Sequence, residues 1–261
     1  MEDIDALLQR GSSINVSKRQ LSSLPAAFTK LAHQFSKLDL STNALVDLSS
    51  LAGCSSLHWL DAHGNLLTSL EGIGSCSTLL VLNACHNRIQ DISALQSLTN
   101  LCSLVLSDNQ IEKTKQLPIA FKLNNLVLSD NSIKKLSKNI GKLSSLQRLS
   151  LSRNKLSVFP EFPFLGNLEQ LRLNGNRFPA VPPCLSACRR LRLLDLGNNN
   201  IDDLALALGV LRHISLRNLS LRGNPCAQSE AYSAEVAAAL PRLEVFDDKV
   251  LHTRYAACCG G

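Results

Sequence analysis

The stretch LCSLVLSDNQI at residues 101–111 decides the fold, because close copies of it recur along the chain. Three of these copies are LNNLVLSDNSI at 123–133, LQRLSLSRNKL at 146–156 and LEQLRLNGNRF at 168–178. They share the pattern L-x-x-L-x-L-x-x-N-x-L, whose asparagine returns every 22 to 25 residues, at Asn43, Asn65, Asn87, Asn109, Asn131, Asn154, Asn176, Asn199 and Asn224. A period of this length indicates a solenoid, in which each repeat is one coil stacked on the next.

Each repeat carries four apolar positions: eight, five and three residues before its asparagine, and two after it. In all nine repeats these positions hold Leu, Ile, Phe, Ala or Cys. A degenerate tenth copy comes first, with Ile14, Val16, Leu21 and Leu24 at apolar positions and Arg19 at the asparagine position. The L-x-L core alternates with period two, so we expect a short strand with its leucines facing inward.

The asparagines are expected to form a structural ladder along the stack. An asparagine amide can both donate and accept hydrogen bonds, and the turn after each strand contains backbone groups that would otherwise be buried and unpaired. A single coil cannot cover its own apolar edge, so we expect each coil to depend on its neighbours for stability.

The pattern resembles the leucine-rich-repeat family over about Ile14 to Val245. The 22-residue repeats resemble the intracellular class of the protein phosphatase 1 regulatory subunit. The C-terminal segment with Tyr232, Val236 and Leu240 resembles the cap of that protein, of U2 small nuclear ribonucleoprotein A-prime and of dynein light chain 1. The resemblance implies an α/β solenoid of about ten repeats, with a curved parallel sheet on the concave face and short helical or irregular convex segments.

The expected organisation has four parts. Residues 1–12 form an N-terminal capping helix with Ile4, Leu7 and Leu8 on one face, and residues 13–224 form the leucine-rich repeats. Residues 225–247 form a C-terminal cap, and residues 248–261 form a flexible tail.

Composition is consistent with an intracellular protein. The 261 residues are 45% hydrophobic, 18% charged and 4% aromatic, so the chain can bury a leucine-based core. The acidic start Met-Glu-Asp-Ile-Asp predicts no secretory signal, and no apolar run is long enough to span a membrane. Nine cysteines without such a signal favour a reducing compartment. We expect a cytoplasmic monomer, with the nucleus as the alternative location, and no membrane partner.

The residues six, four and two before each asparagine should face the concave surface. In the first half they include apolar side chains where solvent is expected, which is the composition of interface hot spots. Alternatively, valine simply suits strands and the tryptophan packs on its neighbours. The candidate partner-binding residues of this half are Asp39, Trp59, Asp61, His63, Val81, Asn83, Val105 and Val127.

The second half is basic. Residues 141–222 contain 12 Lys or Arg against 5 Asp or Glu, which favours an acidic partner. We expect a zone made of Arg148, Arg172 and Arg222 as partner-binding residues, together with Arg153, Arg192 and Arg217. The alternative is a solvated surface that pairs with Glu169 and Asp195.

No motif predicts catalysis, a cofactor or a metal site. Asp61, His63, Cys85 and His86 fall on neighbouring rows, so a Cys/His dyad or a transition-metal site is conceivable. A flat strand face, however, offers no pocket that excludes water. The cysteines at 54, 76, 184 and 226 occupy apolar positions and are expected in the core. The tail pair at 258 and 259 does not fit a lipidation signal.

The expected function is therefore a non-enzymatic interaction scaffold or regulatory subunit. The resemblance to the phosphatase subunit implies a phosphatase catalytic subunit as partner, and Asp39, Trp59 and Asp61 fit that class's acidic and aromatic contacts, although no further aromatics follow. One alternative is a ribonucleoprotein component whose arginine-rich half contacts an RNA-bound complex, so that nucleic-acid binding would be indirect. The other is a cytoskeletal adaptor that binds a dynein or other motor component.

Overall fold

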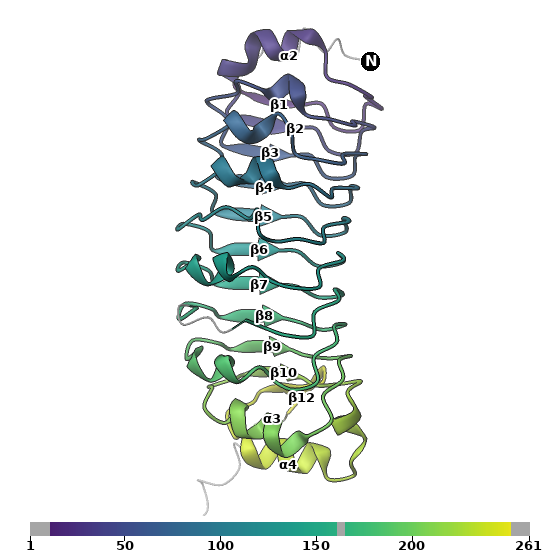
Figure 1. Ribbon diagram of the computed structural model, residues 1–261, viewed down its shortest axis with the longest axis vertical. Helices are drawn as coiled ribbons and strands as arrows, with labels where there is room; N and C mark the ends of the chain where they lie inside the picture. The colour runs from purple at the N-terminus through teal and green to yellow at the C-terminus, as the bar shows by residue number, and fades with distance from the viewer. Residues whose placement is uncertain (1–10, 161–164, 252–261) are drawn as a thin grey trace, which may run out of the picture.

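In the computed structural model, residues 11–160 and 165–251 are described, and they form one continuous stack of coils (Figure 1). Within these ranges the chain builds a 12-stranded sheet whose strands lie in chain order from β1 to β12. The strands are β1 (Ser13–Asn15), β2 (Lys37–Asp39), β3 (Trp59–Asp61), β4 (Val81–Asn83), β5 (Ser103–Val105), β6 (Asn125–Val127), β7 (Arg148–Ser150), β8 (Gln170–Arg172), β9 (Leu193–Asp195), β10 (Asn218–Ser220), β11 (Val245–Phe246) and β12 (Lys249–Val250).

The apolar periodicity explains why these short strands form. In each of β1 to β10 the central residue is buried and its two neighbours face the concave side. The four apolar positions of the nine repeats are all buried, and none of their side chains is more than 5% exposed. Parallel pairing keeps equivalent residues opposite one another, for example Leu104 beside Leu126. The predicted α/β leucine-rich-repeat solenoid is therefore confirmed.

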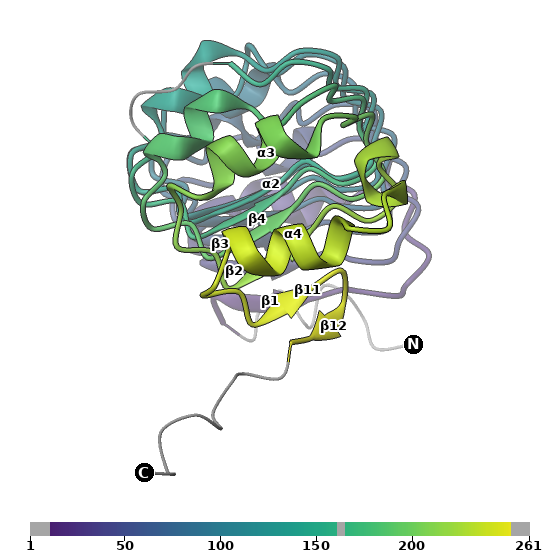
Figure 2. The ribbon, with the colours of Figure 1, turned by 90° about the horizontal axis from the view of Figure 1, so that it is seen from below.

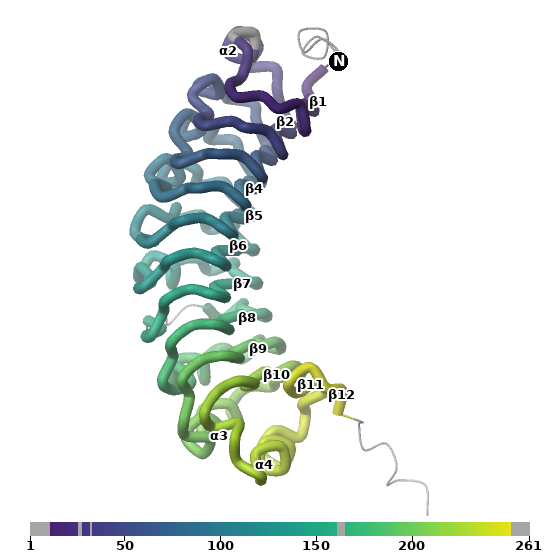
Figure 3. The backbone as a smooth tube through the Cα atoms, turned by 90° about the vertical axis from the view of Figure 1, so that its right-hand side faces the viewer, coloured from purple at the N-terminus to yellow at the C-terminus, as the bar shows by residue number. Residues whose placement is uncertain are grey.

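The outer side of each coil is closed by a turn, a short helix or an irregular segment. The stack bends so that the strands line its inner side (Figure 3). The α-helices are α2 (Ala26–Leu31), α3 (Leu204–Leu211) and α4 (Tyr232–Ala239). The 3-10 helices are η1 (Ala32–Gln34), η2 (Ser49–Leu51), η3 (Ile73–Ser75), η4 (Ser93–Ser97), η5 (Lys138–Lys142), η6 (Pro183–Ala187) and η7 (Pro225–Gln228).

The asparagines connect successive coils through hydrogen bonds. The Asn109 amide nitrogen donates to the carbonyls of Ala84 at 3.0 Å, Leu106 at 3.1 Å and Ser107 at 3.2 Å. Its oxygen accepts from the Ile89 N–H of the preceding coil at 2.9 Å. These backbone groups lie where water does not reach, so an unpaired one would cost on the order of 1–3 kcal/mol.

The turn that presents each asparagine has a left-handed residue directly before it. All nine of these residues have φ between 51° and 74°, including Thr42, His86 and Arg153, whose side chains make this conformation costly. The turn therefore persists in these repeats because the surrounding coil and the asparagine hydrogen bonds over-determine it.

The C-terminal end differs from the expected organisation. The predicted flexible tail from residue 248 is wrong in its first residues, because β12 pairs antiparallel with β11. The Asp247 carboxylate accepts from the backbone N–H groups of Leu221 at 2.8 Å and Arg222 at 3.0 Å, and from the Tyr232 hydroxyl at 2.8 Å. These bonds connect the hairpin to α4 and to the residues that follow β10, and α4 lies across the end of the stack (Figure 2). The N-terminal helix expected over residues 1–12 lies almost wholly outside the described residues, as does the tail beyond 251.

The cysteines at apolar positions are mostly in the core. Cys54, Cys76 and Cys226 are buried, as expected from their positions in the repeat. Cys184 is only half-buried, packs against the core and has its Sγ 3.7 Å from the Pro160 carbonyl oxygen.

Candidate partner-binding face

The first half of the concave face carries four apolar side chains, which we call the apolar patch: Trp59, Val81, Val105 and Val127. Strand register places Trp59 directly beside Val81 and Val105 directly beside Val127. Each of the four is half-buried. They pack against neighbouring strands on one side and still present apolar surface to the hollow of the solenoid.

Trp59 is held in place by a cation. The Lys37 Nζ lies 4.4 Å from the centroid of the indole ring, within the range of a cation–π interaction. Lys37 is the residue opposite Trp59 in the neighbouring strand. The indole therefore has a defined orientation before any partner arrives, which lowers the entropy that binding must overcome.

The polar border of the apolar patch is also ordered. The Asp61 carboxylate lies 2.8 Å from the His63 Nδ1, and it accepts from the His63 N–H at 3.0 Å and from the Asn83 amide at 3.2 Å. On the next strand the Asp39 carboxylate accepts from the Ser41 hydroxyl at 2.6 Å. These contacts leave two ordered acidic groups beside an oriented tryptophan.

The four residues considered for a Cys/His or metal site do not converge. The His86 Nδ1 lies 2.7 Å from an oxygen of Asp108, in the turns that follow the strands. Burial raises the pKa of the Cys85 thiol, and the nearby Asp61 charge raises it further, so the reactive thiolate is disfavoured. Over residues 11–160 and 165–251, no group of three or more His, Cys, Asp or Glu side chains is arranged to hold a metal ion.

The predicted arginine zone does not form one surface. Arg148, Arg172 and Arg222 lie on the concave rows, whereas Arg192 and Arg217 precede their strands and belong to the edge of the sheet. The other expected member, Arg153, lies in a turn and forms an ion pair with Asp130. The strands β9 and β10 begin one position after Arg192 and Arg217, so these two side chains and Arg153 lie off the concave rows, and the grouping of all six on adjacent strands was wrong.

Carboxylates reach the concave arginines from the C-terminal hairpin. The Arg222 guanidinium lies 3.8 Å from Asp248, and Arg217 lies 3.3 Å from Glu244 at the edge. Because both ion pairs are exposed to solvent, each contributes little to the free energy of folding. They nevertheless offset the positive charge, so the concave second half carries charges of both signs.

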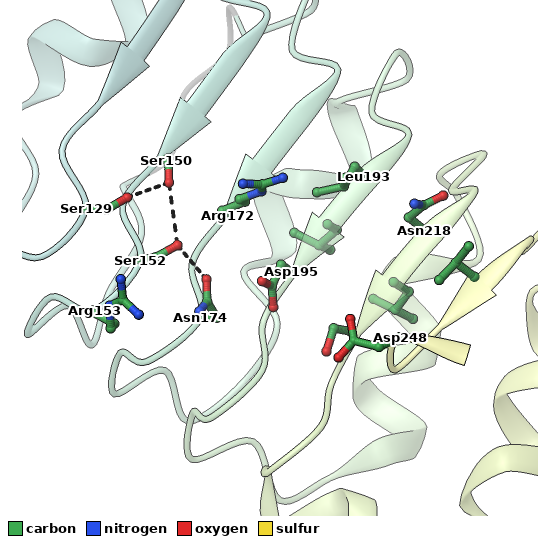
Figure 4. Close-up of a pocket in the computed structure, with 14 residues that line it drawn as sticks. Ser129, Ser150, Ser152, Arg153, Arg172, Asn174, Leu193, Asp195, Asn218 and Asp248 are labelled. Carbon is green, nitrogen blue, oxygen red and sulfur yellow. Dashed lines mark hydrogen bonds between the residues drawn. The ribbon is translucent and has the colours of Figure 1, made fainter. Parts of the chain in front are cut away.

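A polar hollow of about 360 Å³ lies on this half (Figure 4). A row of hydrogen-bonded side chains lines this hollow. The hydroxyl oxygens of Ser129 and Ser150 are 2.6 Å apart, and the Ser152 hydroxyl donates to the Asn174 amide oxygen at 2.5 Å. Arg172 and Asp195 lie beside this row. Sequence reasoning missed the hollow because the C-terminal hairpin, which forms part of its wall, does not follow the repeat.

Asp195 is a half-buried carboxyl that lines the hollow. Burial raises its pKa, and the charges of Asp247 and Asp248 act in the same direction. The Gly197 N–H, which donates to it at 3.0 Å, and the Arg172 charge offset this only in part. A folded-state pKa above the unfolded value means that ionisation of Asp195 costs stability, and this cost grows as pH rises through the carboxyl range.

We therefore expect Asp195→Asn to raise the Tm at pH 7, since the amide oxygen still accepts from Gly197. The gain should disappear below about pH 3, where the wild-type carboxyl is protonated in both the folded and the unfolded state. Thermal melts at the two pH values test this, with Asp202→Asn as an exposed control. A gain that is equal at both pH values would show that charge is not its cause.

Comparison with known proteins gives the class. The family model described as leucine rich repeat matches residues 121–178, and a model of two leucine-rich-repeat copies matches residues 166–208. Chaoptin of Drosophila melanogaster is 39% identical over 87 residues, which are 33% of this chain and 6% of chaoptin. Acidic leucine-rich nuclear phosphoprotein 32 family member A of Drosophila pseudoobscura pseudoobscura is 32% identical over 104 residues, 40% of each chain. U2 small nuclear ribonucleoprotein A′ of Candida glabrata is 31% identical over 105 residues, 40% of this chain and 39% of that protein.

Solved structures agree on the fold. A leucine-rich-repeat protein of Leptospira interrogans matches with a TM-score of 0.74 at 23% identity, covering 94% of this chain and 69% of that one. An internalin of Listeria monocytogenes matches with a TM-score of 0.67 at 17% identity, covering 94% of this chain and 88% of that one. At these identities the likeness concerns the fold.

The chain is built of leucine-rich repeats, as its fold and the family-model matches over residues 121–208 show. It spans at most two fifths of the three relatives named above. The fold is typical of non-enzymatic domains that hold protein partners. In the described part of the chain, the helices are all too short or too polar to cross a lipid bilayer.

Proposed function

We propose that this protein is a non-enzymatic scaffold or regulatory subunit that binds a folded protein partner on its concave face, centred on the apolar patch. The observation that carries the proposal is the oriented, half-exposed Trp59 with valines on three following strands and the ordered Asp39 and Asp61 at its border. A buried aromatic anchor inside a polar rim is the usual composition of a protein-binding hot spot.

The apolar patch fits a partner with an apolar ridge flanked by basic side chains, because the carboxylates of Asp39 and Asp61 face the same hollow. A phosphatase catalytic subunit and a cytoskeletal motor component are the two partner classes that the sequence resemblances imply. We propose that binding takes place inside the cell, in the cytoplasm or the nucleus. The nuclear names of two relatives support this location.

Trp59→Ala is expected to keep the fold and to weaken the partner by about tenfold or more, because truncation removes the anchor of the apolar patch. Affinity capture from cell lysate with mass spectrometry would compare this variant with the wild type. Val158→Ala is the matched control, since it removes an apolar side chain that is 68% exposed outside the strands. Equal capture by all three proteins would exclude the apolar patch as the binding site.

The second candidate function is that of a ribonucleoprotein component that contacts an RNA-bound complex. The exposed Arg148 and Arg172 on the concave face support it, as does the name of the Candida glabrata relative. In that case the captured partners would be lost after ribonuclease treatment or in the Arg148→Glu and Arg172→Glu double variant. Partners that resist ribonuclease and depend on Trp59 would favour the protein scaffold.

A further inference from the structure

The edge of the sheet where the strands begin changes character halfway along the solenoid. Its residues are those from twelve to seven positions before each asparagine. In the coils of β2 to β5 these are residues 31–36, 53–58, 75–80 and 97–102, and they contain no Lys, Arg, Asp or Glu. The same positions in the coils of β6 to β10, together with residues 239–244 before β11, contain eight Lys or Arg and two acidic residues. We call this second stretch the basic edge.

The cations of the basic edge are exposed and lie on the coils of β6, β7, β9, β10 and β11, but not on the coil of β8. Six of them are Lys122, Lys142, Arg189, Arg190, Arg192 and Arg212. The acidic residues are Glu169 and Glu244, and the latter already pairs with Arg217. Because adjacent strands lie about 5 Å apart, the charges extend over about 25 Å from β6 to β11. An extended row of cations, interrupted only at the coil of β8 where Glu169 lies, suits a linear polyanion better than a single small anion.

An exposed aromatic ring lies at the start of the basic edge. Phe121 is 65% exposed, and it borders a hollow of about 510 Å³ together with Lys142, Asn167 and Arg190. Arg190 donates to the Asn167 amide oxygen at 2.6 Å, and the Asn167 amide donates to the Ser144 carbonyl at 2.9 Å. A second hollow of about 530 Å³ continues past Arg189 to His213 and Ser215. The guanidinium of Arg190 is thus positioned between the ring and the next hollow.

We propose that the basic edge binds a single-stranded nucleic acid, with one base stacked on Phe121 and the phosphates running along Lys142, Arg190 and Arg189. The combination of an exposed ring with a cationic track is what single-strand binding requires, since stacking needs an unpaired base and the backbone needs neutralisation. This surface is separate from the concave face, so a protein partner and a nucleic acid can be held at once.

Fluorescence anisotropy with a labelled oligouridylate of about 12 nucleotides tests this directly. Arg189→Glu with Arg190→Glu is expected to lower affinity by at least about tenfold, and higher salt should weaken the wild type. Lys134→Glu with Lys135→Glu is the matched control, because it reverses the same number of exposed charges on the opposite edge. Equal losses in both double variants would mean non-specific charge attraction and would overturn the proposal.

Substitutions at Phe121 distinguish base stacking from a simple apolar contact. Phe121→Leu should lower affinity by about fivefold or more, while Phe121→Trp should retain it, because only the latter offers a ring. Full affinity of Phe121→Leu, or displacement of the probe by polyglutamate as readily as by unlabelled oligouridylate, would favour an acidic polypeptide and contradict the proposal. Absence of probe binding by the folded wild type at low salt would also contradict it. Thermal melts of each variant establish that the fold is intact.

Discussion

Asn109→Asp is expected to destabilise the protein by about 3 kcal/mol or more at pH 7, which exceeds the roughly 1–3 kcal/mol expected for Asn109→Ala. The two variants remove different parts of the ladder. Alanine leaves the buried Ile89 N–H without an acceptor, whereas the Ala84 and Leu106 carbonyls still receive the amides of Asn87 and Asn131. A carboxylate keeps the bond from Ile89 but turns a negative oxygen toward those carbonyls.

The effect of Asn109→Asp should depend on pH. Burial among carbonyls raises the folded-state pKa of the introduced carboxyl above its unfolded value of about 4. Its penalty therefore grows as pH rises from about 4 to the folded-state value and shrinks as pH falls. Urea unfolding of variant and wild type at pH 7 and pH 4.5 measures this difference. Asn200→Asp, at the exposed neighbour of the ladder residue Asn199, should show neither effect.

Gly72→Ala has the other large expected effect, about 3 kcal/mol or more of destabilisation. Gly72 has φ of +97°, and a Cβ placed there would lie 2.1 Å from the Leu48 carbonyl oxygen and 2.8 Å from the Ser49 Cα. Both contacts are to backbone of the preceding coil, which cannot move without disturbing the register of the stack. The cost therefore combines left-handed strain with overpacking.

Gly53→Ala should carry the strain without the overpacking, so the difference between the two variants isolates the overpacking. Gly53 has nearly the same φ, +93°, but its added Cβ would meet nothing within 4 Å. We expect a loss of about 1–2 kcal/mol from strain at this position. Chemical denaturation of the two variants compares them, and equal losses would mean that the close approach of neighbouring coils at Gly72 is not limiting.

Most of the fold was predictable because its information is local and repeated. Counting back from each asparagine gives the buried centre of every strand from β2 to β10, such as Leu104 and Leu126, since a fixed period places equivalent residues in register. The same counting assigns Trp59 and Val105 to the concave face. It would also have excluded Arg192 and Arg217, which lie seven residues before their asparagines.

The remaining features depend on contacts that do not repeat. The bonds to Asp247 from Tyr232 and from Leu221, which follows β10, connect segments with no common spacing, so no periodicity indicates them. The carboxylates that β11 and β12 bring to Arg217 and Arg222 follow from that hairpin. The contrast between the neutral and the basic edge, in turn, is visible only when the coils are aligned by their asparagines and the edge residues are known to be exposed.

The central claim is that the apolar patch is the binding surface for a protein partner. Its most direct test is the dissociation constant of the purified captured partner for two double variants. Val105→Glu with Val127→Glu places charges on the concave face, and Val158→Glu with Leu206→Glu places the same charges on apolar side chains that are 68% and 66% exposed outside the sheet. We predict that the first pair weakens binding by about tenfold or more while the second pair leaves it unchanged. Unchanged binding by the Val105→Glu and Val127→Glu variant, with weakened binding by the Val158→Glu and Leu206→Glu variant, would contradict this claim.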